Sequence, residues 1–201
     1  MGLLSNLFGG SRAERERKRI KELSRRAQEK YGDPAARTRA LEQLRDIGTP
    51  EAIAALLQRF TVKTEPGITD TEEREFTLSI VTSFGDAAVG PVEEFIRTQE
   101  NVAWGLRCLE QLVTAQERVG FLVEVLEKLA REYTREPDKK VLLLNHLAEL
   151  RDPRIGPVAA LFLADPSDEV RIAALHTLVA QGDASAVPGI AACLIEAEAA
   201  R

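Results

Sequence analysis

Apolar residues recur along the chain at helical spacing, in short stripes separated by glycine, proline and charged residues. Over 33–48, Asp33 predicts an N-cap, Pro34 the first helical residue and Gly48 the end of the helix. A second helix then begins at Thr49-Pro50 in the same way. The stripes are Ala40, Leu41, Leu44 and Ile47 in the first helix, and Ile53, Leu56, Leu57 and Phe60 in the second. Two helices separated by two residues predict an antiparallel hairpin.

The hairpin pattern recurs four more times, each time around a stripe of the Leu-x-x-Leu type. The first leucines of the five stripes are spaced 28 to 38 residues apart: Leu41, Leu78, Leu106, Leu144 and Leu175. Three of them are followed, thirteen residues later, by a proline, with a polar turn in between: Gly85-Asp86 and Pro91, Arg151-Asp152 and Pro157, Gly182-Asp183 and Pro188. The third repeat lacks this proline, and its second helix is expected to run longer.

A lone amphipathic hairpin cannot bury its apolar face, so consecutive hairpins must stack to form a core. The sequence therefore predicts an all-α fold, a right-handed α-solenoid of about five hairpins with an N-terminal capping helix. The repeat domain is expected over 33–199, and its repeats at about 33–60, 71–98, 100–133, 137–164 and 166–199.

This pattern resembles HEAT repeats, in particular the short bacterial type named after phycobilisome lyase subunits. The resemblance covers roughly 33–199 and rests on the leucine stripes, the in-phase turns and prolines, and Val170-Arg171 in the last repeat. Arg59-Phe60-Thr61, Thr69-Asp70 and Trp104 are also similar to a small bacterial HEAT family without an assignable activity. The resemblance implies a surface that binds another protein, rather than a particular reaction.

A charged helix is predicted over 11–31, before the first hairpin. Its narrow apolar stripe consists of Ile20, Leu23, Ala27 and Tyr31. Its charge pairs at i,i+4 are expected to be Glu14–Lys18, Glu22–Arg26 and Arg25–Glu29. The helix is expected to cap the open end of the stack with a solvated outer face, and a binding site for a basic partner is the alternative.

The segment 1–10 is a separate apolar element, decoupled from the helix by Gly9-Gly10. It carries four large apolar residues at i, i+1, i+4 and i+5, which form one face in a helical conformation: Leu3, Leu4, Leu7 and Phe8. Three alternatives stay open for them. They dock into a groove of a partner, they insert shallowly into a membrane, or they fold back onto the first hairpin.

Charge is distributed unevenly along the chain, whose formal net charge is −5. Residues 1–31 contain nine Lys/Arg against four Glu, whereas the remainder contains eighteen Lys/Arg against twenty-eight Asp/Glu. The acidic body argues against a nucleic-acid partner, because phosphate neutralisation supplies most of the non-specific affinity of such proteins. The basic residues of 1–31 leave room for contact with anionic lipid or with an acidic protein surface.

Other features of the sequence indicate a protein of the cytoplasm. No apolar stretch approaches the ~18 residues of a membrane span, and the apolar residues at the start precede the positive ones, the reverse of a secretory signal. Two cysteines, Cys108 and Cys193, cannot build a disulfide framework. They are expected two layers apart in the stack, too far for a disulfide.

No enzyme, metal or cofactor is expected. A di-iron hydroxylase of the HEAT type uses His-Glu dipeptides as ligands, but Leu147 follows His146 and Thr177 follows His176. Cys108 and His146 are expected ~10 Å apart in adjacent repeats, beyond a shared ion at ~2 Å. HEAT-like DNA glycosylases need a basic, aromatic face, and phycobilin lyases a pigment-binding surface. A lyase-like enzyme is retained only as a rival.

The expected function is that of a non-catalytic scaffold or adaptor whose second helices line the concave side of the solenoid. The charged groups expected on that side are Arg59, Glu93, Glu94, Arg97, Glu124, Glu127 and Lys128, and their acidic excess predicts a partner with a basic helix or tail. The linker 61–71, longer than the other connections, is expected to add Lys63 and Glu65 as specificity groups and to cap the next helix with Asp70 or Thr71.

Two questions stay open at this level. Trp104 is expected near the linker or inside the stack, with buried packing favoured. Oligomeric state is undetermined, because Leu3 to Phe8 or a final helix carrying Ile190, Cys193 and Leu194 offers a surface for a second copy. The leading rival to the scaffold is a membrane-peripheral regulator anchored through residues 1–31.

Overall fold

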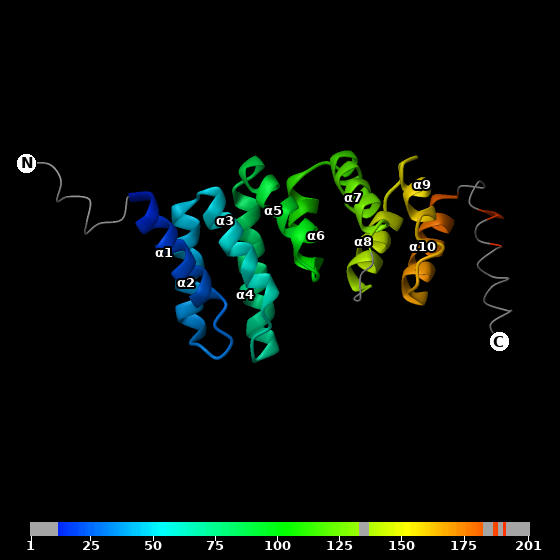
Figure 1. Ribbon diagram of the computed structural model, residues 1–201. Coiled ribbons are helices and arrows are strands. Elements are labelled where there is room, and N and C mark those ends of the chain that lie inside the picture. The colour runs from blue at the N-terminus through cyan, green and yellow to red at the C-terminus, as the bar shows by residue number, and fades with distance from the viewer. Residues whose placement is uncertain (1–11, 133–136, 183–186, 189–190, 192–201) are drawn as a thin grey trace, which may run out of the picture. The chain divides into compact units, whose positions relative to one another are not determined.

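The computed structural model describes residues 12–132, 137–182, 187–188 and 191. These contain ten α-helices, one 3₁₀ helix and no strand (Figure 1). The predicted all-α fold is confirmed. The chain divides into two compact units, described here one at a time: residues 1–96 with 104–112, and residues 97–103 with 113–201. The apolar segment Leu3–Phe8 and the last predicted helix, with Ile190, Cys193 and Leu194, lie outside the described residues.

The first unit contains the hairpin predicted at 33–60 and the helices around it. The helices, in chain order, are α1 (Arg12–Ala27), α2 (Pro34–Ile47), α3 (Pro50–Leu57), the 3₁₀ helix η1 (Gln58–Thr61), α4 (Gly67–Ser83), α5 (Asp86–Thr98, to residue 96) and α6 (Ala103–Leu112, from residue 104). α1 packs on both α2 and α3, and α4 packs on the same two helices. The α2–α3 hairpin therefore forms the centre of this unit.

The caps of α2 and α3 agree with those expected from the sequence. The Asp33 side chain accepts a hydrogen bond from the Ala35 N–H, and the Thr49 hydroxyl accepts one from the Ala52 N–H. Gly48 ends α2 in the left-handed conformation, with a φ of 65°, and its N–H donates to the Leu44 carbonyl. The predicted stripe residues Leu41, Leu44, Ile53 and Leu56 are fully buried.

The charged helix α1 ends earlier than expected, at Ala27. Ile20, Leu23 and Ala27 are buried as predicted, but Tyr31 lies beyond the helix and is 88 % exposed. The turn that follows is fixed because the carbonyls of Glu29 and Gly32 both accept hydrogen bonds from the Arg37 guanidinium.

The charge pairing on α1 also differs in part from the prediction. The pair of Glu22 with Arg26 is present at 3.0 Å. Arg25 binds the same carboxylate at 2.9 Å, through Nη2, rather than pairing with Glu29. One glutamate between two arginines therefore replaces two separate pairs.

The predicted start of the fourth helix, α4, is wrong. The helix begins at Gly67, so the linker between η1 and α4 is only residues 62–66. Neither Asp70 nor Thr71 is the N-cap, because both lie within the first turns. The Thr71 hydroxyl donates to the Gly67 carbonyl, whereas Asp70 is buried and binds groups of the linker.

The second unit contains α7 (Ala115–Leu129), α8 (Asp138–Ala148), α9 (Ile155–Ala160) and α10 (Asp168–Gln181). α7 is longer than α9, as the sequence indicates for the third repeat, and it begins with a capping box between Thr114 and Glu117. α8 packs on α7 and α10. The Thr177 hydroxyl in α10 donates to the Leu144 carbonyl in α8 at 2.9 Å.

A close helix contact in the first unit depends on Gly105 in α6. A Cβ atom there would lie 2.9 Å from Phe95 Cδ1 and 3.0 Å from Ile96 Cγ1, both on α5. Both neighbours are buried, so neither has open space to move into. Only glycine allows this approach without displacing one of them.

We expect Gly105→Ala to lower the free energy of unfolding by about 1–2 kcal/mol. Overpacking costs about 1–3 kcal/mol, which exceeds the ~1 kcal/mol that alanine gains in helix propensity. Gly67→Ala is the matched control, because a Cβ at Gly67 meets nothing within 4 Å. Urea unfolding followed by circular dichroism measures both variants, and equal stabilities would contradict the close contact.

Candidate functional site

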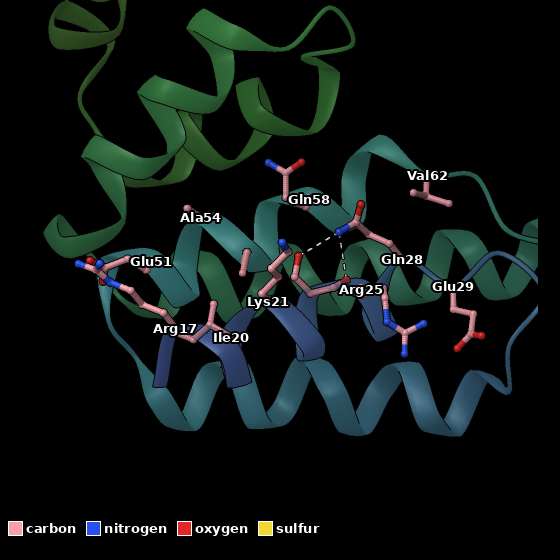
Figure 2. Close-up of a pocket in the computed structure, with 12 residues that line it drawn as sticks. Arg17, Ile20, Lys21, Arg25, Gln28, Glu29, Glu51, Ala54, Gln58 and Val62 are labelled. Carbon is pink, nitrogen blue, oxygen red and sulfur yellow. Dashed lines mark hydrogen bonds between the residues drawn. The ribbon is translucent and has the colours of Figure 1, made fainter. Parts of the chain in front are cut away.

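An open groove runs between α1 and α3 in the first unit (Figure 2). Its volume is about 740 Å³, within the range of ligand sites in proteins. The helix α1 supplies one wall, and α3 with η1 supplies the other. The lining residues are Arg17, Ile20, Lys21, Ser24, Arg25, Gln28, Glu29, Glu51, Ala54, Ala55, Gln58 and Val62.

The groove exists because α3 presents small side chains toward α1. Ala54 is exposed and Ala55 is buried, and Ile20 of α1 is buried between the two helices. Neither alanine reaches far enough to fill the space beside Ile20. The floor is therefore apolar, and the charged side chains stand along its edges.

The edges of the groove carry opposite charges on different elements. The α1 edge contributes Arg17, Lys21 and Arg25, and Arg25 is held by Glu22. Glu51 stands on α3, and Glu29 lies just past the end of α1. A ligand with an apolar face and acidic groups along one side matches this arrangement.

A second hollow of about 400 Å³ continues the groove toward the first residues of α1. It shares Arg17, Ile20 and Glu51 with the groove and adds Arg12, Ala13 and Glu16. The two hollows together form the α1–α3 groove, which follows α1 from its first described residue and extends past its end to Glu29.

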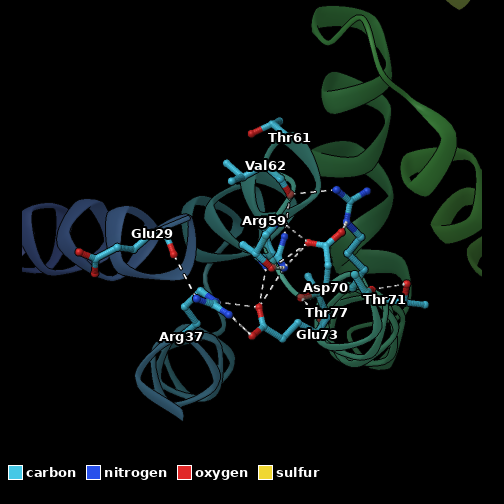
Figure 3. Close-up of polar contacts among 12 residues, drawn as sticks. Glu29, Arg37, Arg59, Thr61, Val62, Asp70, Thr71, Glu73 and Thr77 are labelled. Atoms are coloured by element: carbon cyan, nitrogen blue, oxygen red, sulfur yellow. Dashed lines mark hydrogen bonds and ion pairs between the residues drawn. The ribbon is translucent and has the colours of Figure 1, made fainter. Parts of the chain in front are cut away.

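A network of buried charges lies next to the Val62 end of the groove, and Arg59 is at its centre (Figure 3). Arg59 is 0 % exposed. Its guanidinium donates to Glu73 Oε2 at 2.9 and 3.1 Å and to Asp70 Oδ1 at 2.7 Å. It also donates to the carbonyl of Val62 at 2.8 Å and to the Thr64 hydroxyl at 3.1 Å.

The same glutamate binds a second buried arginine. Arg37 of α2 is 1 % exposed and forms a bidentate pair with Glu73, with Nη2 to Oε1 at 2.8 Å and Nε to Oε2 at 2.9 Å. Its Nη1 donates to the carbonyls of Gly32 at 2.7 Å and Glu29 at 3.2 Å. Glu73 therefore joins α2, η1 and α4.

Asp70 completes the network on its outer side. Its carboxylate accepts hydrogen bonds from the Thr64 N–H at 2.9 Å and from Arg59, and it pairs with Arg74 at 2.9 Å. Burial alone would raise the pKa of Asp70. The hydrogen bonds from Arg59 and Thr64 and the charge of Arg74 outweigh burial, so the pKa lies below its ordinary value of 3.8.

The network fixes both chain segments that end the groove. Arg59 and Arg74 hold the carbonyl of Val62, and Arg37 holds the carbonyl of Glu29. Val62 and Glu29 line the groove from opposite sides. The distance between the two walls at this end is therefore set by buried ion pairs.

Arg59 was expected on a partner-facing surface, and the structure places it in the interior instead. An arginine with full burial and paired hydrogen bonds has no guanidinium face to offer a ligand. Lys63 and Glu65 are exposed on the linker that Arg59 anchors. Arg59 thus holds the linker backbone from the interior and is not part of the exposed surface of the linker.

Trp104 is half-buried and stacks on Phe60. Their ring centroids are 5.5 Å apart, with an interplanar angle of 11°. The Arg107 guanidinium lies 4.3 Å from the Trp104 ring and forms a bidentate pair with Glu75. Trp104 thus contacts the end of the α3–η1 segment, within the first unit.

The other candidate residues on second helices are mostly at the surface. In the first unit, Glu93 is half-buried and Glu94 is exposed. In the second unit, Arg97 is exposed, lies 3.7 Å from Glu124 and sits over the Phe121 ring at 4.7 Å. Glu127 and Lys128 are exposed on α7. Their role in binding a basic partner stays a prediction.

The described residues contain no group of three or more His, Cys, Asp and Glu side chains arranged to hold a metal ion. Cys108 is buried, and burial raises the pKa of its thiol to about 12, against a smaller opposing effect of Arg107. The thiol is therefore protonated at neutral pH and is a poor nucleophile.

Three residues of the site were not predicted from the sequence: Arg37, Glu73 and the groove residue Ala54. A pattern did exist for the first two. Arg37 lies on the stripe of Leu41 and Leu44 at i+4 and i+7, and Glu73 precedes buried Thr77 by four residues. A charge on an apolar stripe requires a buried partner, and these two satisfy each other. No comparable pattern marks Ala54.

The comparisons with known proteins agree with this fold. Residues 36–60 match a family model described as PBS lyase HEAT-like repeat, a range that covers most of α2, all of α3 and most of η1. No curated protein and no solved structure matches the chain. This match and the all-α fold support a HEAT-like repeat protein, and repeats of this kind generally mediate protein–protein interaction. None of the described helices has both the length and the apolar character needed to cross a membrane.

We expect Glu73→Gln to lower the free energy of unfolding of the first unit by about 3–5 kcal/mol, because it leaves two buried guanidiniums without their shared counter-charge. Glu75→Gln is the matched control on the same helix. It removes a pair whose two side chains are each 46 % exposed, so its expected cost is below ~1 kcal/mol. Urea unfolding followed by Trp104 fluorescence measures the stability of both variants. Equal losses of unfolding free energy in the two variants would contradict a larger contribution from the buried ion pairs.

The stability contributed by Asp70 should depend on pH. Because its pKa is lowered in the folded chain, the contribution is complete above the ordinary pKa of 3.8 and is lost as the pH falls through the lowered value. Asp70→Asn should therefore destabilise the chain at about pH 5, and the difference from wild type should shrink toward about pH 2. Thermal unfolding across this range measures it, and a constant difference would contradict the assignment.

Proposed function

We propose that the chain is a non-catalytic adaptor or scaffold that binds a helix of a partner protein in the α1–α3 groove. The groove itself is the observation that carries this proposal. Its larger hollow has an apolar floor between charged edges. The second hollow, lined mostly by charged side chains, extends it along α1. HEAT-like repeats generally mediate protein–protein interaction.

The dimensions of the groove suit a helix as ligand. α1 has 16 residues, which corresponds to a length of about 24 Å at about 1.5 Å per residue. A helix of three to four turns would fit along it. Such a ligand presents anchors at i, i+3, i+4 and i+7 toward Ile20, Ala54 and Ala55.

The edge charges define the ligand further. Arg17 and Lys21 on α1 favour a partner helix with acidic residues on the side that faces α1. This ligand differs from the basic helix expected for the exposed acidic residues Glu94, Glu124 and Glu127. The binding of a basic partner by these residues stays a prediction, taken separately for Glu94 in the first unit and for Glu124 and Glu127 in the second.

The rigidity of the groove supports an adaptor role. A site whose walls are fixed before binding loses less conformational entropy when the ligand arrives. The carbonyls of Val62 and Glu29 are held by buried arginines, so this end of the groove is preorganised. The exposed Lys63 and Glu65 project from the same anchored linker.

Affinity capture from host lysate with three baits tests the proposal. The baits are the wild-type chain, Ala54→Arg and Ala87→Arg. Ala54 lines the groove, whereas Ala87 is exposed on α5 and does not. An arginine on the groove floor blocks an apolar ligand face, so we expect at least about tenfold weaker retention of a specific partner, equal to ~1.4 kcal/mol or more.

A protein retained by wild type and Ala87→Arg and lost with Ala54→Arg supports the groove as the docking site. Circular dichroism must show equal helicity for the three baits. Equal retention of every captured protein by all three would contradict the proposal.

A further inference from the structure

The larger hollow of the α1–α3 groove is not apolar along its whole length. On the α3 side, Ala54 and Ala55 come first, and Gln58 follows about one helical turn later. Gln58 is half-buried, and Val62 ends this side of the hollow. Two apolar stretches are therefore separated by one carboxamide.

The α1 side of the hollow has the same order of apolar and polar groups. Ile20 is buried, and the half-buried Ser24 and Gln28 follow it at i+4 and i+8. Both walls run in the same direction, so Gln28 and Gln58 both lie beyond the apolar floor, toward Val62 (Figure 2). The hollow therefore has an apolar section and, next to it, a polar section lined by both glutamines.

The two glutamine amides differ in how much of their hydrogen-bonding capacity is used. Gln28 Nε2 donates to the Ser24 carbonyl at 3.0 Å and to the Ser24 hydroxyl at 2.9 Å. These bonds fix the Gln28 amide and leave its oxygen as an acceptor. The Gln58 amide forms no hydrogen bond within the part of the chain that the structure describes. The polar section thus offers an acceptor on each amide and a donor on Gln58.

A ligand that covers the polar section removes both amides from water. A buried amide without a hydrogen-bond partner weakens binding, and an apolar side chain of the ligand supplies no partner. A carboxylate only accepts hydrogen bonds, so it cannot bind the oxygen of Gln28. An ammonium group only donates, so it cannot bind the N–H groups of Gln58. A carboxamide carries both a donor and an acceptor, and it can therefore satisfy both glutamines.

We propose that the helix bound in the groove presents an asparagine or a glutamine to Gln28 and Gln58. This carboxamide lies about one helical turn from the apolar side chains that the same helix places against Ile20 and Ala54. The inference rests on the proposed function, because it requires a partner helix in the groove. The apolar side chains of the ligand supply affinity, and its carboxamide determines the register.

The polar section also discriminates against other amphipathic helices. A helix whose apolar face continues without a break buries both glutamine amides without partners. A matching helix that shifts by one turn does the same, and it also places its own carboxamide against the alanines of α3. Both mismatches oppose the wrong ligand and the wrong register, so the groove selects by what it leaves unpaired as well as by apolar contact.

Two synthetic helices that differ in one side chain test the inference on the full chain. Each is a stapled, fluorescently labelled peptide of about four turns, with leucines at i, i+3 and i+11 and glutamates along one flank. One peptide carries asparagine at i+7, and the other carries leucine, which has nearly the same size and shape. We expect fluorescence anisotropy to show that the asparagine peptide binds the wild-type chain about tenfold more tightly.

Variants of the chain show whether the two amides cause this preference. Gln28→Leu combined with Gln58→Leu removes both amides, so the leucine peptide should then bind at least as tightly as the asparagine peptide. Gln111→Leu is the matched control, because Gln111 is exposed on α6 outside the groove, and it should keep the wild-type preference. Circular dichroism must show equal helicity. Gln58→Leu alone keeps the bonds between Gln28 and Ser24, and it should reduce the preference in part.

The possible outcomes separate this inference from the proposed function. A preference for the asparagine peptide that is lost in the double variant supports the inference. Equal binding of the two peptides to the wild-type chain, or a preference that the double variant keeps, would overturn the inference and leave helix docking in place. Binding of neither peptide, or binding that Ala54→Arg does not weaken, would contradict helix docking in the groove and this inference with it.

Discussion

The first unit depends on one shared counter-charge, the Glu73 carboxylate between Arg37 and Arg59. Removing three charges from water is costly, and an apolar cluster of the same volume could be equally stable. An apolar cluster, however, would leave the Gly32 carbonyl without the Arg37 donor and the Val62 carbonyl with Arg74 as its remaining side-chain donor. The arginines supply those hydrogen bonds from the interior, so the buried charges specify the path of two connecting segments.

This constraint explains why the connecting segments are ordered parts of the site. The turn after α1 and the linker before α4 contain few apolar residues that could pack them in place. Arg37 and Arg59 hold their backbones, and exposed side chains such as Lys63 are presented from a fixed base. Beside them, Ala54 and Ala55 leave the space that forms the groove. The small side chains of α3 give the groove its shape, and the buried ion pairs hold its Val62 end rigid.

Periodicity and capping predicted most of the helices, because they depend on neighbours in the sequence. Asp33, Thr49 and Gly48 have their expected roles for this reason. Asp70 did not, because its cap-like position at the end of a polar linker is also within reach of Arg59, eleven residues away. Tyr31 fits the α1 stripe, yet the Arg37 bonds turn the chain before it. The groove depends on the side-chain volumes of two helices that pack together. The residue pattern of one helix alone therefore does not predict it.

The stack of Trp104 on Phe60 gives the chain a built-in optical reporter. Trp104 is the only tryptophan, and all its described ring and cation contacts lie within the first unit. Its fluorescence therefore follows the α3–η1 segment and the helices around it, while circular dichroism follows helices of both units. Comparing the two signals along one denaturation curve separates loss of the groove from loss of the whole fold, without a label or an added residue.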